Sequence, residues 1–522
     1  MEMLGIGAAV SVLAACSGSA APGSAYPGHA TAAATLRSGI GLSLTAATRA
    51  PAKDSVLAET TPGTLTTAFA RTLFTRAPVV VVSGTGARAL QAAEADARAA
   101  HAPVLLASSA TAAPAASATV LAQLAASARA LHPVAVLAEG LPAAWPAALA
   151  ARLPGVKVVR SAAALPATRA PAPLSRVAIL VAAAAAASAK SSASIAAVTA
   201  TAQAAGAAVV DMTGTDPRAD PAAITALARL RPESVVAIGS QFGSAALLAS
   251  RVAVAETGRQ LPGGGQVLFP GRRLVALYGH PGTSGLGVLG EQDLSASIAR
   301  ARQMAAPYRP LSSVPVVPAF EIIASVAEAS PGPDGSYSYE TPVSELLPWV
   351  RQATADGLYV VLDLQPGRAN LLTQAEHYQS LLELPDVGLA LDAEWKLQPG
   401  QKPLRQIGHV DISEVNSVVD WLAALTARHD LPQKLLVLHQ FQLQMLTGER
   451  DLDTSHDDLA IVIHMDGQGT PGVKQGTWNA VTAAAPRGVF FGWKNFLVKD
   501  HPMLTPGQTM TEKPSPVMIS YQ

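Results

Sequence analysis

Ionisable and aromatic residues spaced two apart follow several short apolar runs in the C-terminal half of the 522-residue chain. The run VGLALDAEW, residues 387–395, ends with Asp392 and Glu394. The same spacing recurs at the ends of three other runs, as Asp363 with Gln365, His464 with Asp466, and Tyr278 with His280. Side chains two apart on a strand share a face and lie about 7 Å apart. Two carboxyl groups on one face can hydrolyse a glycosidic bond, one as a protonated acid and the other as an ion.

The runs that carry these residues are eight in number, and most of the intervals between them have room for a helix. They cover 274–280, 314–321, 358–365, 387–395, 434–441, 459–467, 488–495 and 516–522. Helices are expected at 293–306, 343–356, 371–384, 414–428 and 474–485. Eight strand–helix units in about 250 residues predict a (β/α)8 TIM-type barrel over residues 273–522, with an open doubly wound sheet as the alternative.

In such a barrel the carboxyl ends of all strands meet at one mouth, where the active sites of these enzymes lie. We therefore predict four catalytic carboxyl groups: Glu394, Asp392, Asp466 and Asp363. The predicted substrate-binding residues are Tyr278, His280, Glu321, Gln365, Arg368, His439, His464, Trp493, Lys494 and Tyr521. Crowded acids raise one another's pKa, which keeps one of them protonated near neutral pH. The indole of Trp395 either supports a sugar ring or packs under a helix.

The ending LALDAEW resembles the Asp-x-Glu signature on the fourth strand of family-18 and family-25 glycoside hydrolases. The resemblance implies that Glu394 is the acid, with Asp392 orienting an acetamido group or stabilising the oxocarbenium ion. The first run departs from it, since Tyr278-Gly-His280 stands where the lysozymes of family 25 carry an aspartate. The seventh run offers Lys494, so a glutamate pair on strands four and seven is excluded. The YGHPG, LDLQPGR and GWKN segments are similar to those of a family of secreted actinobacterial proteins.

Two other functions for the barrel remain open from the sequence. His280, His439, His464, Asp363 and Asp466 provide imidazole and carboxylate groups for a zinc-dependent hydrolase, although no HxH or HExxH spacing is present. A barrel mouth rich in polar groups also suits a glycan-binding protein without catalysis. We expect neither a metal nor an organic cofactor.

The N-terminal half shows a repeated pattern of strands and helices. Strands are expected at 78–84, 102–108 and 133–140, and again at 176–182, 207–212 and 234–240. Proline- and glycine-rich stretches at 165–174 and 258–273 separate the pieces, which predicts two small parallel α/β modules of flavodoxin or Rossmann type over 35–165 and 175–257. The first resembles the type 2 cell-wall-binding repeat in Ser83-Gly84, residues 102–106 and Gly140, but Arg88 replaces its aspartate. The resemblance implies a cell-wall polysaccharide as a partner.

The N-terminus indicates export. A short apolar segment leads to Leu13-Ala14-Ala15-Cys16, followed by small residues, and is too short to span a bilayer. The motif resembles the bacterial lipobox, which implies a signal peptide and linker over 1–34 and a lipid anchor at Cys16; the unusual Glu2 departs from it. Lys and Arg total 37, as do Asp and Glu, which argues against nucleic acid as a partner. We expect a bacterial protein that is lipid-anchored outside the cytoplasmic membrane, or secreted.

Overall fold

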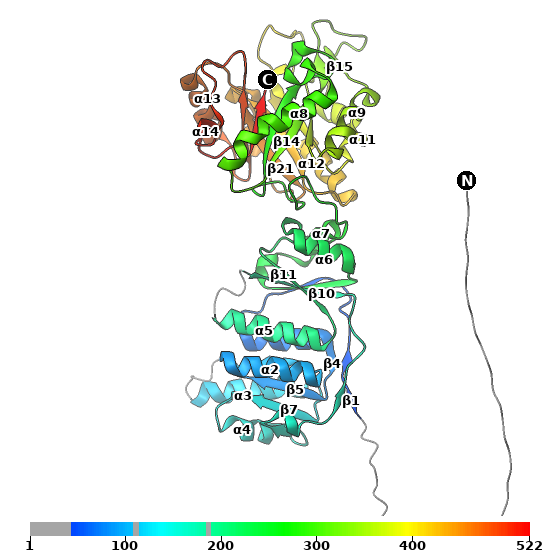
Figure 1. The fold of residues 1–522 in the computed structure, drawn as a ribbon, viewed down its shortest axis with the longest axis vertical. Coiled ribbons are helices and arrows are strands. Elements are labelled where there is room, and N and C mark those ends of the chain that lie inside the picture. Colours follow the sequence, from blue (N-terminus) through cyan, green and yellow to red (C-terminus); the bar gives the residue numbers. More distant parts are fainter. Residues whose placement is uncertain (1–42, 108–113, 184–188) are drawn as a thin grey trace, which may run out of the picture. The chain divides into compact units, whose positions relative to one another are not determined.

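The computed structural model describes residues 43–107, 114–183 and 189–522 (Figure 1). The predicted signal peptide and Cys16 lie outside the described residues. None of the helices in the described ranges has the length and apolar character needed to cross a lipid bilayer.

The described residues before position 258 contain two four-stranded parallel sheets. The first has the order β6-β5-β7-β8 and consists of β5 (Val79–Ser83), β6 (Val104–Leu106), β7 (Ala135–Glu139) and β8 (Lys157–Val159). Its helices are α2 (Ala87–Ala100), α3 (Pro114–Arg129) and α4 (Trp145–Arg152). The central strand β5 is buried along its whole length, as a run of four valines requires.

The second sheet has the order β11-β10-β12-β3 and takes one strand from earlier in the chain. It consists of β10 (Val177–Ala182), β11 (Ala208–Met212), β12 (Ser234–Ile238) and β3 (Ser55–Leu57), with helices α5 (Ala189–Ala204), α6 (Pro221–Leu230) and α7 (Ala245–Glu256). Helix α5 packs against α2 and α1 (Pro62–Leu73). The Val104 amide of the first sheet donates a hydrogen bond to Thr201 of α5 at 3.0 Å. The two sheets therefore share elements across the predicted boundary between the modules.

Residues 273–522 form a closed barrel of eight parallel strands surrounded by helices, a TIM-like fold. The strands are β13 (Arg273–Gly279), β14 (Val316–Ala327), β16 (Tyr359–Leu364), β17 (Val387–Asp392), β19 (Lys434–Gln440), β21 (Leu459–Met465), β22 (Phe490–Asn495) and β23 (Met518–Tyr521). Closure is shown by β13, which pairs in parallel with both β14 and β23. The barrel prediction is confirmed, and the open-sheet alternative is excluded.

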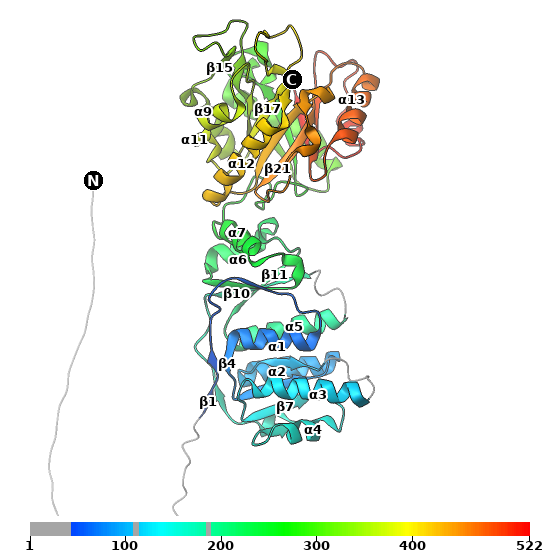
Figure 2. The same ribbon diagram turned by 180° about the vertical axis from the view of Figure 1, so that it is seen from behind.

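Helices cover the outside of the barrel, and all but one lie at or near the predicted ranges. They are α8 (Leu294–Ala305), α9 (Val343–Ala355), α10 (Leu371–His377), α11 (Gln379–Leu382), α12 (Ile412–Arg428) and α13 (Pro471–Ala484). The short α14 (Pro506–Thr509) was not predicted. Figure 2 shows α12 over the outside of the strands. The predicted helix at 371–384 is divided into α10 and α11 at Tyr378. Side chains of Asp293, Asn370 and Asp411 cap the first turns of α8, α10 and α12 by accepting backbone N–H hydrogen bonds.

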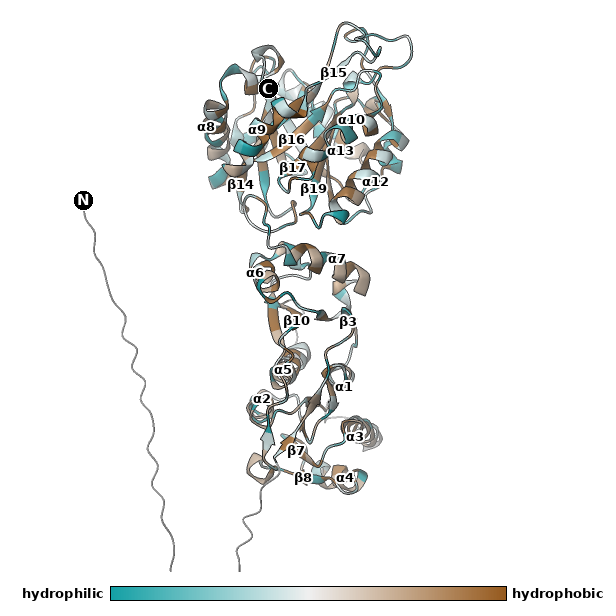
Figure 3. Cartoon of the chain, turned by 90° about the vertical axis from the view of Figure 1, so that its right-hand side faces the viewer, coloured by the Kyte–Doolittle hydropathy of each residue, from teal (hydrophilic) through white to brown (hydrophobic). Residues whose placement is uncertain are grey.

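The alternation of side chains along each strand separates two apolar layers. On β16, Val360, Leu362 and Leu364 pack toward the helices, whereas Tyr359 and Val361 fill the barrel interior. The strands are accordingly among the most hydrophobic parts of the barrel in Figure 3. At the amino-terminal end, Leu268 and Phe269 of the preceding connection close the interior. The other end is left for polar side chains.

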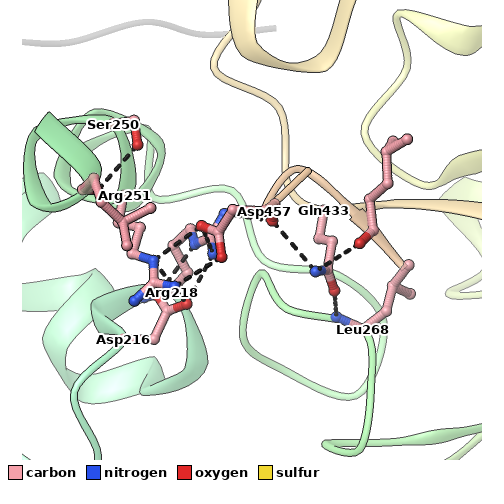
Figure 4. A network of polar contacts seen from close by, with 9 residues as sticks. Asp216, Arg218, Ser250, Arg251, Leu268, Gln433 and Asp457 are labelled. Atoms are coloured by element: carbon pink, nitrogen blue, oxygen red, sulfur yellow. Dashed lines mark hydrogen bonds and ion pairs between the residues drawn. The ribbon is translucent and has the colours of Figure 1, made fainter. Parts of the chain in front are cut away.

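A network of charged groups connects the segment around α6 and α7 to the loop before β21 (Figure 4). Asp457 Oδ2 accepts hydrogen bonds from Arg218 Nη2 at 2.5 Å and from Arg251 Nε at 2.9 Å. Asp216 also pairs with Arg218, at 2.8 Å. The Arg218 side chain is only 3% exposed, so these carboxylates supply its counter-charge inside the protein.

Candidate functional site at the barrel mouth

Strand alternation places one polar side chain after another at the carboxyl end of the barrel interior. On β19, for example, Leu435 and Val437 lie in the interior layer, and His439 is the next side chain on the same face. The same rule brings together Tyr278, Glu321, Asp363, Asp392, His439, His464 and Lys494, and Asp466 follows β21 directly. All of these side chains are buried. We call this set the mouth cluster.

His439 lies at the centre of the mouth cluster between carboxylates. Its Nδ1 is 2.8 Å from Asp466 Oδ2, and its Nε2 is 3.0 Å from Glu321 Oε1 and 3.7 Å from Asp363 Oδ1. Burial alone would lower the pKa of His439, but Asp466 and Glu321 raise it well above its usual value. The imidazole is therefore a buried cation that donates from both nitrogens.

Lys494 supplies the second positive charge. Its Nζ lies 3.4 Å from Asp466 Oδ2 and 3.5 Å from the ring centroid of Tyr278, as a cation–π contact. Against the effect of burial, Asp466 and Glu321 raise the pKa of Lys494. Burial would also raise the pKa of Asp466, yet the charges of His439 and Lys494 hold it far below its usual value. Asp466 is thus a fixed anion at the edge of the mouth cluster.

Asp363 occupies a different electrostatic position. Its Oδ2 accepts a hydrogen bond of 2.8 Å from the Tyr278 hydroxyl, which in turn accepts one of 3.3 Å from Gln365 Nε2. Burial raises the pKa of Asp363 to about 6, an effect that His439 opposes and Glu321 reinforces. One buried carboxyl group therefore titrates near neutral pH while its neighbour Asp466 does not.

Asp392 and Glu394 do not share a strand face as predicted, because β17 ends at Asp392 and residues 393–395 form a 3-10 turn. The Asp392 carboxylate instead accepts a hydrogen bond from the Glu394 amide at 3.4 Å. Burial raises the pKa of both groups. The charge of Glu394 raises the pKa of Asp392 further, and the charge of Asp466 does the same for Glu394. Of the four predicted catalytic acids, Asp363, Asp392 and Asp466 are buried and Glu394 is partly exposed.

Glu394 borders an open pocket of about 330 Å³, which we call the loop pocket. Trp395, Leu397 and residues 403–407 form the rest of its lining. The indole of Trp395 is partly exposed there, which favours a wall of the pocket over packing beneath a helix. Glu394 thus lies between the buried charges and open space.

His464 is a neutral histidine within the mouth cluster. Burial lowers its pKa to about 4, and its Nε2 lies 2.7 Å from Ser520 Oγ on β23. Sequence reasoning missed Ser520 and selected its neighbour Tyr521 instead. The alternation of β23 contains the signal, because Met518 lies in the interior layer and Ser520 shares its face.

Two predicted substrate-binding residues lie in the outer layer of the barrel. Trp493 is fully buried beside Trp478, and its Nε1 donates to Asn495 Oδ1 at 3.0 Å. The hydroxyl of Tyr521 is 2.6 Å from that of Tyr308 beneath α8 and the turn that follows it. Odd and even positions face opposite sides of a strand, so each aromatic residue points away from the interior-facing neighbour, Lys494 or Ser520.

Two others lie at the rim. His280 Nε2 is 3.1 Å from Thr341 Oγ1, and His280 lines a separate pocket of about 160 Å³. Arg368 lies over the Tyr337 ring at 4.6 Å and donates to the Gln401 carbonyl at 2.8 Å. Arg368 therefore holds two loops together, and both of its contacts are within the protein.

A metal would compete with charges that the mouth cluster already has. Both nitrogens of His439 face carboxylates, and its raised pKa keeps them protonated, whereas a metal ligand must offer a lone pair. Among the described residues, the group spaced to hold an ion is Asp420, Asp453 and His456, at the surface and away from the mouth cluster. In this arrangement His439 therefore offers no nitrogen lone pair to a zinc ion.

Comparison with protein-family models, curated proteins and solved structures finds no match to this chain.

Proposed function

We propose that the barrel hydrolyses glycosidic bonds in a cell-wall or extracellular polysaccharide, with Glu394 as the proton donor. The observation that carries the proposal is the contrast between two neighbouring acids: Glu394 has a raised pKa and borders a pocket, whereas Asp466 has a lowered pKa. When the surroundings raise the pKa of one carboxyl group and lower that of its neighbour, the first can act as the protonated acid and the second as the ion.

In this mechanism the protonated Glu394 gives its proton to the leaving oxygen. Positive charge then develops on the sugar ring, and the ionised Asp466 stabilises it or adds to it as a nucleophile. Water then attacks the same ring carbon and gives a proton to Glu394, which releases the sugar and restores the protonated acid. His439 and Lys494 keep Asp466 ionised, and Glu321 balances their charge. Asp392 accepts the Glu394 amide hydrogen bond and so fixes the turn that carries the acid.

The test compares Glu394→Gln with Glu328→Gln, an exposed glutamate just beyond β14. Both variants are incubated with purified wall glycan and with extracellular polysaccharides, and released reducing ends are measured. Loss of a general acid should lower the rate by about 10²- to 10⁴-fold, while Glu328→Gln should match the wild type. Circular dichroism checks that both variants are folded.

Three results would redirect the proposal. Wild-type protein that binds glycan and releases no reducing ends indicates a binding protein. Equal activity in Glu394→Gln and wild type removes Glu394 from the mechanism. Activity that is lost with a chelator and restored by zinc indicates a metal-dependent hydrolase.

The location of the protein is part of the same proposal. The Leu-Ala-Ala-Cys motif supports a lipid anchor at Cys16, and the resemblance of residues 35–165 to a wall-binding repeat supports contact of the α/β modules with the cell wall. Cys16→Ser should abolish incorporation of labelled fatty acid and release the protein from the membrane fraction. Retention of the label would exclude this cysteine as the anchor.

A further inference from the structure

The loop pocket has a wall made from a long connection that returns to its own starting point. Residues 396–409 leave the turn that carries Glu394 and come back to it, where the Gly408 amide donates to the Glu394 carbonyl at 2.7 Å. A side chain at Gly408 would collide with the carbonyl oxygens of Lys396 and Glu394. The Leu397 amide also donates to the Gly367 carbonyl at 2.7 Å. Backbone hydrogen bonds therefore fix both ends of the connection that lines the pocket.

Large apolar side chains of this connection are exposed to solvent. Leu404 is 83% exposed and has a φ of 61°, a left-handed conformation that is unfavourable for a bulky residue. Ile407, 42% exposed, lies on the same pocket lining as the Trp395 indole. Backbone strain together with exposed apolar surface is typical of ligand-binding loops. The apolar faces of sugar rings pack against such walls.

The pocket also has a cation that is not neutralised within the protein. Arg405 lines the pocket and is exposed, and its guanidinium makes no hydrogen bond or ion pair with any residue in the described ranges. By contrast, the neighbouring Lys396 is buried and is paired with Glu414 at 2.6 Å. A planar guanidinium binds carboxylates through two parallel hydrogen bonds. Apolar side chains and one unpaired guanidinium therefore line the same pocket.

We propose that the loop pocket binds a sugar residue that carries a carboxylate, and that Arg405 recognises this carboxylate. Because Glu394 forms part of the pocket, the bound residue lies on the leaving-group side of the bond to be cut, an assignment that rests on the proposed hydrolysis. The volume of about 330 Å³ suits one or two sugar residues. The carboxylate belongs either to a uronic acid or to a lactyl ether such as that of wall glycan.

Binding is measured by calorimetry with the mature full chain that carries Glu394→Gln, so that turnover does not interfere. The probes are a galacturonic acid hexasaccharide and peptide-free wall glycan strands, each with its carboxyl groups intact or reduced to alcohols. Intact probes should bind about 10- to 100-fold more tightly than reduced ones, as expected for one charged hydrogen-bonded pair. Preference for the hexasaccharide alone identifies uronic acids, and preference for the wall strands alone identifies the lactyl group.

Two further substitutions in the same background assign the preference to one side chain. Arg405→Gln should abolish it. Lys402→Gln removes an equal charge from the same connection outside the pocket lining and should keep it. Equal binding of intact and reduced probes, no binding of either, or a preference that survives Arg405→Gln would overturn the inference. If the preference is found but wild type releases no reducing ends, the hydrolysis proposal fails and the acidic-sugar site stands.

Discussion

His439 Nδ1 lies 2.8 Å from Asp466 Oδ2, and both groups are buried at the mouth of the barrel. Replacing His439 by Gln removes the cation that Asp466 and Glu321 share. Because uncompensated buried charge is costly, the free energy of unfolding should fall by about 3–5 kcal/mol. Urea denaturation followed by tryptophan fluorescence measures this change.

The matched control is His456→Gln, because His456 pairs with Asp420 at 3.0 Å at the surface. Exposed pairs contribute less than about 1 kcal/mol. The effect of His439→Gln should also depend on pH. The folded pKa of His439 is raised, so its contribution is complete below the unfolded value of about 6.5 and is lost as pH rises through the folded pKa. Equal losses in the two variants would show that His439 is uncharged.

The Tyr278→Phe substitution removes the hydroxyl and keeps the ring, so it tests the contribution of the hydroxyl alone. The ring stays beneath Lys494, but Asp363 Oδ2 loses the donor at 2.8 Å and Gln365 loses its acceptor. Leaving buried polar groups without partners should cost about 1–3 kcal/mol. The control is Tyr339→Phe at a residue that is 50% exposed, where no change in the denaturation midpoint is expected. A Tyr278→Phe variant as stable as this control would contradict the hydrogen-bonded arrangement.

The barrel could be predicted from the sequence because its signals are local. Each strand is an apolar run with a polar end. Eight such strands that alternate with helices are typical of a sheet that closes into a barrel. The inward positions at the mouth, such as Asp363, His439 and Lys494, follow from alternation on the same strands. These members of the mouth cluster could therefore be predicted from the sequence alone.

Three features depend on information that a single run does not contain. The strand VGLALD stops at Asp392 because the Asp392 carboxylate caps the next turn, which places Glu394 by turn geometry instead of strand alternation. Trp493 was predicted to bind substrate, but it faces outward because Lys494 occupies the inward position. The pairing of β3 with β12 joins residues about 180 apart, beyond the reach of any local pattern.

Asp363→Asn should change how stability depends on pH. The folded pKa of Asp363 is about 6, above the ordinary value of 3.8, so the folded state binds an extra proton between these values. The contribution of this proton is complete below pH 3.8 and is lost as pH rises through 6. Wild type should therefore lose up to about 3 kcal/mol relative to the variant across this window.

The measurement is a series of urea denaturation curves from pH 4 to pH 8 for both proteins. Asn keeps an acceptor for the Tyr278 hydroxyl, so the pH-independent part of the comparison should be small. A difference in unfolding free energy that stays constant from pH 4 to pH 8 would show that Asp363 is ionised throughout.

Asp457→Asn tests the charged network around Arg218. The pKa of Asp457 is lowered: burial would raise it, but the hydrogen bond from Arg251 and the charge of Arg218 outweigh that effect. Its contribution is thus complete above the unfolded pKa of about 3.9 and is lost as pH falls. At pH 7 the variant leaves two guanidinium groups with less counter-charge, and Arg218 is only 3% exposed. We expect a loss of about 2 kcal/mol in unfolding free energy.

The control for this prediction is Glu233→Gln, which breaks the pair of Glu233 with Arg176 at 2.8 Å. Both of these side chains are more than half exposed, so water replaces the lost partner and little change is expected. Differential scanning calorimetry at pH 7 and pH 3 compares the two variants with wild type. The Asp457→Asn effect should be larger at pH 7 than at pH 3, which lies below the unfolded pKa. An effect that is no larger than that of Glu233→Gln would mean that Arg218 finds its counter-charge in Asp216 alone.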